Sequence, residues 1–204
     1  QSEMEQQQLI HLAILLDDVA QQHAVERGLT AGFLGSQGSV GKSKLVQQRI
    51  KADAAWDALI KFEKSPSTDK SHPAIQKFID HLGEIIQHKP ATRSAVDSLS
   101  PKSSAFTYYS SLNSDVLTII ELLSPYLVDP DISEPFLIYR NLLIAKENAG
   151  KIRGKINGAI KKGALNDIDH TKISGYIQQH QHALDIAKTN SSEVIKEQFS
   201  VMSK

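Results

Sequence analysis

Apolar residues recur along this chain at steps of three and four, the spacing of one face of an α-helix. From Leu9 the pattern continues through Leu12, Leu16 and Val19 to Leu34. Sustained alternation of β-branched and polar residues, which is typical of strands, is found nowhere. The pattern therefore predicts an all-α protein, an elongated antiparallel helical bundle of about six helices.

Glycine, proline and serine residues mark where the predicted helices end. We expect helices over residues 2–36, 42–63, 73–88, 102–123, 134–162 and from 169 onward, with a weaker helical segment up to Leu99. Ser133 is expected to cap the fifth helix and Gly163 to end it. Residues 1–204 are expected to form a single sensory, ligand-binding domain, with two packed helical sub-bundles as the alternative.

The first and last helices would each be about 50 Å long at 1.5 Å per residue. Both chain ends would then lie at one pole of the bundle. An insert between two membrane helices has this layout, and so does a soluble bundle with adjacent termini.

A weak internal repeat relates residues of about 9–36 to residues of about 135–162, and it aligns Arg27 with Arg153. Each arginine falls in an apolar stripe where a core residue is expected. Small residues surround both and would leave a cavity between closely packed helices: Ala24, Gly28, Ala31, Ala149, Gly150 and Gly154. If the two helices run in the same direction, the two guanidinium groups lie at the same height.

A buried guanidinium requires a negative partner. Two converging guanidinium groups suit a planar oxyanion, because each donates two parallel N–H bonds. An internal ion pair is the alternative, and four carboxylates are available for it: Asp17, Asp18, Glu26 and Glu147. The residues alone leave both possibilities open.

Other polar residues near these positions have less specific interpretations. His23 lies one turn before Arg27 on the inward side, and it either lines the cavity or is a half-buried histidine with satisfied nitrogens. Tyr108 and Tyr109 can offer a hydroxyl to an anion, although aromatic residues in a bundle are more often core residues. Residues 36–43 resemble a phosphate-binding loop, but Ser36 replaces its first glycine and a helix precedes it, so we expect an ordinary turn.

Composition excludes several classes of function. The 23 Lys and Arg residues are balanced by 23 Asp and Glu, so the basic excess typical of nucleic-acid binding is missing. Without cysteine, disulfides, thiolate zinc sites and cysteine nucleophiles are excluded. Histidines such as His180 and His182 lack the spacing of metal ligands, and no nucleophile has a neighbouring base. We expect no metal, no cofactor and no enzymatic activity.

The sequence contains neither a signal segment nor the run of about 20 apolar residues that spans a bilayer. It begins at Gln1 rather than at methionine. We therefore expect a soluble segment, with any membrane helices and output domain lying outside it.

Three blocks of sequence resemble the nitrate- and nitrite-sensing (NIT) domain family. The first is Glu-Arg-Gly-Leu-Thr-Ala-Gly-Phe-Leu at 26–34, followed by Gln48, Arg49 and Asp53. The second is Phe-Thr-Tyr-Tyr-Ser-Ser-Leu-Asn at 106–113, and the third is Leu-Leu-Ile-Ala-Lys-Glu-Asn-Ala-Gly at 142–150, followed by Arg153. The resemblance extends over residues of about 9–165 and departs from the family at Ile152, where an acidic residue is usual.

This resemblance implies a helical sensor domain that binds nitrate or nitrite. Arg27 and Arg153 are the implied anion ligands. From their positions beside these arginines, we expect the candidate lining residues to be Gly28, Ala31, His23 and Gly154. Arg49 is a weaker candidate ligand, equally suited to an ion pair with Asp53 four residues later. Another small anion as ligand, and a helical interaction module without a ligand, remain alternatives.

Family members are often periplasmic domains between two membrane helices of bacterial receptors, coupled to chemotaxis signalling, histidine kinase or cyclic-di-nucleotide modules. A cytosolic version is part of an antitermination protein. We expect a homodimer, a periplasmic location in an inner-membrane receptor, and a signal passed along the terminal helices. A cytoplasmic sensor domain is the alternative.

Overall fold

The computed structural model describes residues 3–100, 103–162, 171, 174–175 and 178. This part of the chain is helical and contains no strand. Its elements are α1 (Glu3–Gly35), α2 (Lys42–Lys64), α3 (Pro73–Ile86), α4 (Lys89–Asp97), α5 (Ala105–Leu123), the short 3₁₀ helix η1 (Ser124–Tyr126) and α6 (Pro130–Lys162). The expected all-α class is confirmed.

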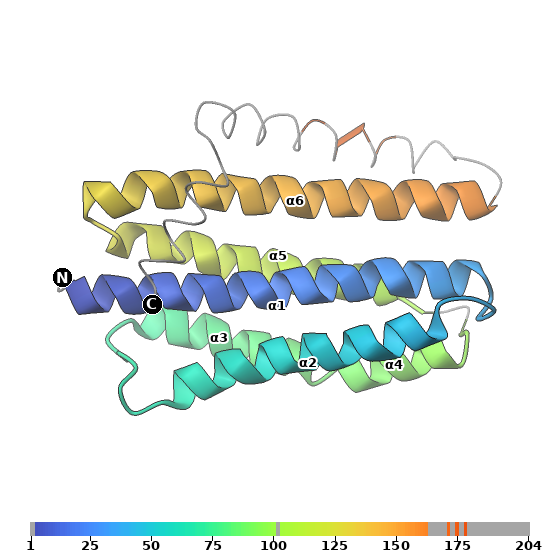
Figure 1. The fold of residues 1–204 in the computed structure, drawn as a ribbon, viewed down its shortest axis with the longest axis horizontal. Helices are drawn as coiled ribbons and strands as arrows, with labels where there is room; N and C mark the ends of the chain where they lie inside the picture. Colours follow the sequence, from blue (N-terminus) through green and yellow to red (C-terminus); the bar gives the residue numbers. More distant parts are fainter. Residues whose placement is uncertain (1–2, 101–102, 163–170, 172–173, 176–177, 179–204) are drawn as a thin grey trace.

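The helices lie side by side along the long axis of the molecule (Figure 1). α2 runs back along α1, α3 and α4 together run forward, α5 runs back again and α6 runs forward (Figure 1). α1 packs mainly against α2 and α5, and it also contacts α6. α1 and α6 are both 33 residues long and point in the same direction (Figure 1). This is the condition under which Arg27 and Arg153 were expected to lie at the same height.

Several boundaries differ from those expected. The weak segment before Leu99 is a full helix, α4, which follows α3 almost directly because Pro90 suits the first turn of a helix. α5 begins at Ala105, three residues later than expected. The expected last helix and Gly163 lie outside the described residues, apart from isolated positions.

The start of α6 corrects the predicted cap. Ser133 lies inside the helix, which begins at Pro130. Asp129 is the capping residue: its carboxylate accepts the backbone N–H of Asp131 at 3.0 Å, and its carbonyl accepts that of Ser133 at 2.8 Å. Proline at the first helical position fits this arrangement, because its missing N–H would have no intrahelical acceptor there.

The connection between α1 and α2 is a tight turn. Gly38 and Gly41 have φ angles of 80° and 88°, which favour glycine. Backbone N–H groups of this turn are occupied internally: Gly38 donates to Phe33 O at 2.9 Å, and Val40 donates to Ser36 Oγ at 3.1 Å. The segment that resembles a phosphate-binding loop therefore folds as an interhelical turn.

Two apolar cores flank a buried polar layer. The larger core joins α1, α2, α3, α5 and α6, and it includes Leu16, Leu59 and Ile120. The smaller core, around Phe33 and Tyr109, lies toward the other end of α1. Between them the polar residues of α1 are almost fully buried: His23, Glu26, Arg27 and Thr30. Buried polar groups are normally hydrogen-bonded, and of these four side chains only the Thr30 hydroxyl has no partner among the described residues.

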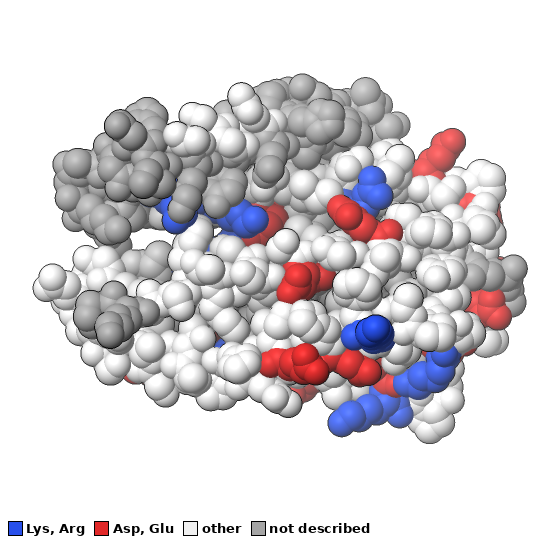
Figure 2. Space-filling view, turned by 180° about the vertical axis from the view of Figure 1, so that it is seen from behind, with Lys and Arg blue, Asp and Glu red and all other residues white. Residues whose placement is uncertain are grey.

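On the face shown in Figure 2, acidic and basic side chains lie in small mixed groups separated by uncharged areas. Among the described helices, none has both the length and the apolar character needed to cross a bilayer.

Candidate functional site

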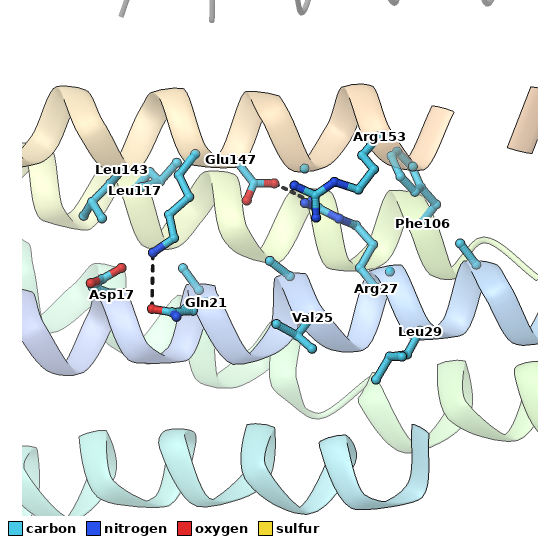
Figure 3. Close-up of a pocket in the computed structure, with 17 residues that line it drawn as sticks. Asp17, Gln21, Val25, Arg27, Leu29, Phe106, Leu117, Leu143, Glu147 and Arg153 are labelled. Atoms are coloured by element: carbon cyan, nitrogen blue, oxygen red, sulfur yellow. Dashed lines mark hydrogen bonds and ion pairs between the residues drawn. The ribbon is translucent and has the colours of Figure 1, made fainter. Parts of the chain in front are cut away.

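A cavity of about 450 Å³ lies where α1, α5 and α6 meet in the polar layer (Figure 3). α1 contributes Asp17, Ala20, Gln21, Ala24, Val25, Arg27, Gly28, Leu29 and Ala31; α5 contributes Phe106 and Leu117; α6 contributes Leu143, Lys146, Glu147, Gly150, Arg153 and Gly154. Five of the predicted site residues are thus brought together: Arg27, Arg153, Gly28, Ala31 and Gly154.

Arg27 is the most deeply buried cation of this cavity, with 3% of its surface exposed. Its Nη1 donates to Glu147 Oε1 and, at 3.3 Å, to the hydroxyl of Ser110. Its guanidinium carbon lies 5.5 Å from the centre of the Phe106 ring. Among the described residues, its Nε and Nη2 have no hydrogen-bond acceptor. The Nε–Nη2 edge therefore offers two parallel donors that no described protein group uses.

Glu147 holds Arg27 in place from α6. Its carboxylate is 7% exposed, and its second oxygen accepts a hydrogen bond from Asn113 Nδ2 at 2.9 Å. Asn113 also donates to the carbonyl of Ala20 at 3.0 Å. An internal ion pair was one of the two possibilities for Arg27, and it forms with Glu147 at one end of the guanidinium.

Arg153 points from α6 toward Arg27 across the cavity (Figure 3). It is exposed, which corrects the expectation of a buried position. Gly150 and Gly154 beside it carry no side chain that covers it. Within the part of the chain described, Arg153 makes no hydrogen bond or ion pair. Two guanidinium groups thus face one space, with one carboxylate between α1 and α6.

The charges lining the cavity do not balance. Among the lining residues that the structure describes, Arg27, Arg153 and Lys146 are cationic, whereas only Glu147 and Asp17 are carboxylates. Lys146 donates to Gln21 Oε1 at 3.3 Å, and Asp17 accepts the hydroxyl of Tyr139 at 2.8 Å. One positive charge is therefore uncompensated among the lining residues, which favours an anionic occupant.

His23 does not line this cavity. It is fully buried, its Nδ1 lies 2.7 Å from the carbonyl of Val19, and its Nε2 lies 3.1 Å from Lys89 Nζ. Burial, together with the positive charge of Lys89, lowers the pKa of His23 to about 4. At neutral pH the ring is therefore uncharged, with Nδ1–H as donor and Nε2 as acceptor. The structure matches the alternative interpretation, a histidine with satisfied nitrogens.

Next to His23 lies a second charged cluster, composed of Glu26, Asp53, Lys89, Arg93 and Tyr109. Glu26 is fully buried and accepts two bonds from Arg93, at 3.0 and 2.7 Å, as well as the Tyr109 hydroxyl. Asp53 accepts from Arg93 at 2.9 Å and from Lys89 at 2.7 Å. Burial acts to raise the pKa of Asp53, but these two cations hold it below its ordinary value. The charged groups of this cluster bind one another, so we interpret the cluster as one that stabilises the fold.

Arg49 also lies outside the cavity, and its expected partner is wrong. Because Arg93 and Lys89 already occupy Asp53, the Nη1 of Arg49 instead pairs with Asp97 at 3.0 Å. Arg49 and Lys42 hold the pKa of Asp97 below its ordinary value, against a smaller effect of burial. The geometry therefore assigns Arg49 to the contact between α2 and α4.

Sequence reasoning missed three residues on α5 that complete the site. Phe106, Ser110 and Asn113 follow a spacing of four and three, which places them on one face of a helix. That spacing within the 106–113 block was a signal that could have identified them. The hydroxyl groups of the two tyrosines considered earlier are used elsewhere: Tyr108 donates to the carbonyl of Ile85 at 2.9 Å, and Tyr109 donates to Glu26.

Comparisons with known proteins agree with this architecture. A family model described as nitrate and nitrite sensing matches residues 18–201. A solved structure of the NasR transcription antiterminator superimposes with a TM-score of 0.87 over 93% of this chain, at 18% sequence identity. The chain spans 52% of the length of that protein, so the likeness concerns the fold of about half of it. No curated protein sequence matches the chain.

Proposed function

The chain belongs to the nitrate and nitrite sensing (NIT) family, and on this premise we propose that it binds one nitrate or nitrite ion between Arg27 and Arg153. One observation carries the proposal. The buried Arg27 is fixed at Nη1, while the donors at Nε and Nη2 have no acceptor among the described residues and face a cavity that Arg153 also enters.

The chemistry of the anion fits this geometry. Nitrate and nitrite each present two oxygens in one plane, which match the two parallel N–H groups of a guanidinium edge. Arg153 supplies further donors from the opposite wall. A monovalent anion would neutralise the single uncompensated charge of the cavity. Phe106 lies against the Arg27 guanidinium and shields that side from water.

Binding would connect two helices that run in the same direction. Without ligand, Arg27 and Arg153 repel each other across the cavity, and an anion between them replaces repulsion by attraction. The ligand therefore favours arrangements in which α1 and α6 lie closer together, and a shift of about 1–2 Å can pass along a helix. We place the domain in a bacterial signalling receptor, with a periplasmic location and a homodimer as the expected setting.

Isothermal titration calorimetry with nitrate and nitrite tests this function, with chloride and acetate as control titrants. Arg153→Ala is the decisive variant, because its side chain is exposed and makes no described bond that supports the fold. Arg49→Ala is the matched control, since it removes an arginine outside the cavity. Saturable heat that disappears in Arg153→Ala and persists in Arg49→Ala is expected. Undiminished nitrate binding by Arg153→Ala would refute the site.

Two rival functions are favoured by specific observations. The Arg27–Glu147 pair satisfies part of Arg27 internally, as a helical interaction module without ligand requires. The cavity of about 450 Å³ is also larger than a nitrate ion, so it has room for another small anion such as a carboxylate. If none of the four titrants gives a heat of binding, the interaction module without ligand is supported. If acetate gives a heat of binding and nitrate does not, the sensor of another anion is supported.

A further inference from the structure

Glu147 belongs to the third sequence block that resembles the family, but the resemblance assigns it no role in the site. Its carboxylate is bound by Arg27 on one oxygen and by Asn113 on the other, so it is anchored to both α1 and α5. It is buried and lies at the wall that an anion on Arg27 would approach. We infer that Glu147 is a specificity-determining residue that restricts this site to singly charged anions, an inference that rests on the proposed function.

Charge balance is the first argument. The described lining residues comprise three cationic side chains and two carboxylates, so one positive charge is uncompensated. A monoanion removes that charge, whereas a dianion such as sulfate leaves a net negative charge in a partly buried cavity. Unpaired charge away from water is costly. Glu147 thus weakens the binding of a doubly charged anion because of its charge, whatever its shape.

The second argument is the division of the Arg27 guanidinium. Glu147 and Ser110 take the Nη1 end, and this leaves only the Nε–Nη2 edge for a ligand. An anion on that edge shares one guanidinium with the Glu147 carboxylate. The ligand and the Glu147 carboxylate are both negative and bind the same guanidinium, so they repel each other. This repulsion grows with the charge of the ligand.

The other lining carboxylate is less suited to this role. Asp17 lies near the far end of the close-up from Arg27 and Arg153 (Figure 3). Its carboxylate accepts a hydrogen bond from Tyr139 at 2.8 Å. Because Coulomb energy falls with distance, Asp17 contributes less than Glu147 to the discrimination between monoanions and dianions.

The test compares nitrate and sulfate affinities of the whole chain by calorimetry. In the parent protein we expect nitrate to bind and sulfate to bind more weakly. Glu147→Gln keeps the size of the side chain and one acceptor oxygen but removes the negative charge. It should raise the ratio of sulfate affinity to nitrate affinity at least about tenfold, which corresponds to about 1.4 kcal/mol of repulsion removed. Glu134→Gln, at an exposed position of the same helix, should keep the parent ratio.

A second variant covers the case in which Glu147→Gln does not fold, as judged by circular dichroism. Gln21→Lys adds a positive charge at an exposed lining position without disturbing the buried pair. It should shift the affinity ratio toward sulfate by several-fold. An unchanged ratio in a folded Glu147→Gln variant would overturn the role of Glu147, and an unchanged ratio in Gln21→Lys would overturn the charge-balance argument for it. Nitrate binding by the parent would still support the proposed function. If the parent protein binds no nitrate, both the proposed function and the role of Glu147 are overturned.

Discussion

The Nη2 nitrogen of Arg27 lies against Gly150, so close that a Cβ atom placed on this glycine would stand 2.7 Å from it. Real Cβ contacts are not this short, and the position of the guanidinium therefore depends on the missing side chain at residue 150. A glycine of α6 thus determines where an arginine of α1 can lie.

Gly150→Ala is expected to displace the Arg27 guanidinium. Because the group that must move is the end of a flexible side chain, the fold should be retained. Nitrate affinity should fall about tenfold or more, since misplaced donors lose their parallel geometry. Calorimetry measures this loss, and circular dichroism checks that the helices remain.

The matched control for this substitution is Gly32→Ala on α1, where a new Cβ meets nothing within 4 Å. Replacing a helical glycine by alanine should stabilise the protein by up to about 1 kcal/mol and leave nitrate affinity unchanged. Equal affinity for nitrate in both variants would contradict the placement of Arg27.

Removing the two cavity arginines should affect stability very differently. Arg27→Ala leaves Glu147 buried with Asn113 as its remaining described partner, and an uncompensated buried charge costs about 3–5 kcal/mol. Arg153→Ala removes an exposed side chain and should change the free energy of unfolding by less than about 0.5 kcal/mol. Urea denaturation measures both.

Replacing the Arg27–Glu147 pair by apolar residues provides the control for that comparison. Arg27→Met combined with Glu147→Leu should recover much of the stability lost in Arg27→Ala, because no buried charge is left unpaired. Nitrate binding should stay absent in the double variant. A loss of stability for Arg153→Ala as large as that for Arg27→Ala would show that the structure misplaces their burial.

The lowered pKa of His23 predicts acid sensitivity. Its pKa is about 4 in the folded protein and 6.5 in the unfolded chain, so the unfolded chain binds more protons between these values. The contribution of His23 to the free energy of unfolding is therefore fully present above pH 6.5. It is lost as the pH decreases from about 6.5 toward 4, which lowers the free energy of unfolding by about 3 kcal/mol in total. The charged groups that face this histidine are Lys89, Glu26 and Arg93.

Thermal unfolding at pH 7 and pH 5 measures this dependence on His23. His23→Gln should flatten the decrease in melting temperature, because glutamine offers a donor and an acceptor but does not titrate. The exposed His81 is the matched control, since His81→Gln should retain the parent pH dependence. An identical pH dependence in His23→Gln and the parent would argue against a buried, neutral His23.

Arg93→Lys is expected to lower stability by about 1–3 kcal/mol, although the charge is kept. The guanidinium binds both oxygens of Glu26 and one of Asp53, and a single ammonium group cannot reproduce this geometry. Arg49→Lys is the control, because its partner Asp97 is 41% exposed and such pairs contribute up to about 1 kcal/mol. Equal losses in both variants would show that the bidentate contact with Glu26 adds little.

Much of the fold could be predicted because it depends on local patterns. The apolar stripes identified α1 and α6 as long helices and placed an arginine at a corresponding position in each. Periodicity also located α2, α3 and α5, whereas α4 has few apolar residues and was only weakly indicated. The start of α6 was misjudged because Asp129 and Ser133 are both good caps. Each is followed by a proline that suits the first turn of a helix, Pro130 or Pro135, so the sequence offers two similar starts.

The pairing of charges could not be predicted from the sequence. Four carboxylates were candidates for Arg27, and the choice of Glu147 depends on the relative height of α1 and α6. Asp53 is four residues from Arg49, yet it pairs with Arg93 and Lys89 from α4. These contacts join distant parts of the chain, so helical spacing contains no information about them.

The buried polar layer fixes the register of α1 against its neighbours. Apolar stripes repeat every three or four residues, so the two apolar cores alone would tolerate a slip of α1 by one helical turn. Such a slip would separate Arg27 from Glu147 and Glu26 from Arg93 together, leaving several charges buried without partners. Two adjacent residues, Glu26 and Arg27, thus lock a 33-residue helix at one axial position through partners on opposite sides of it.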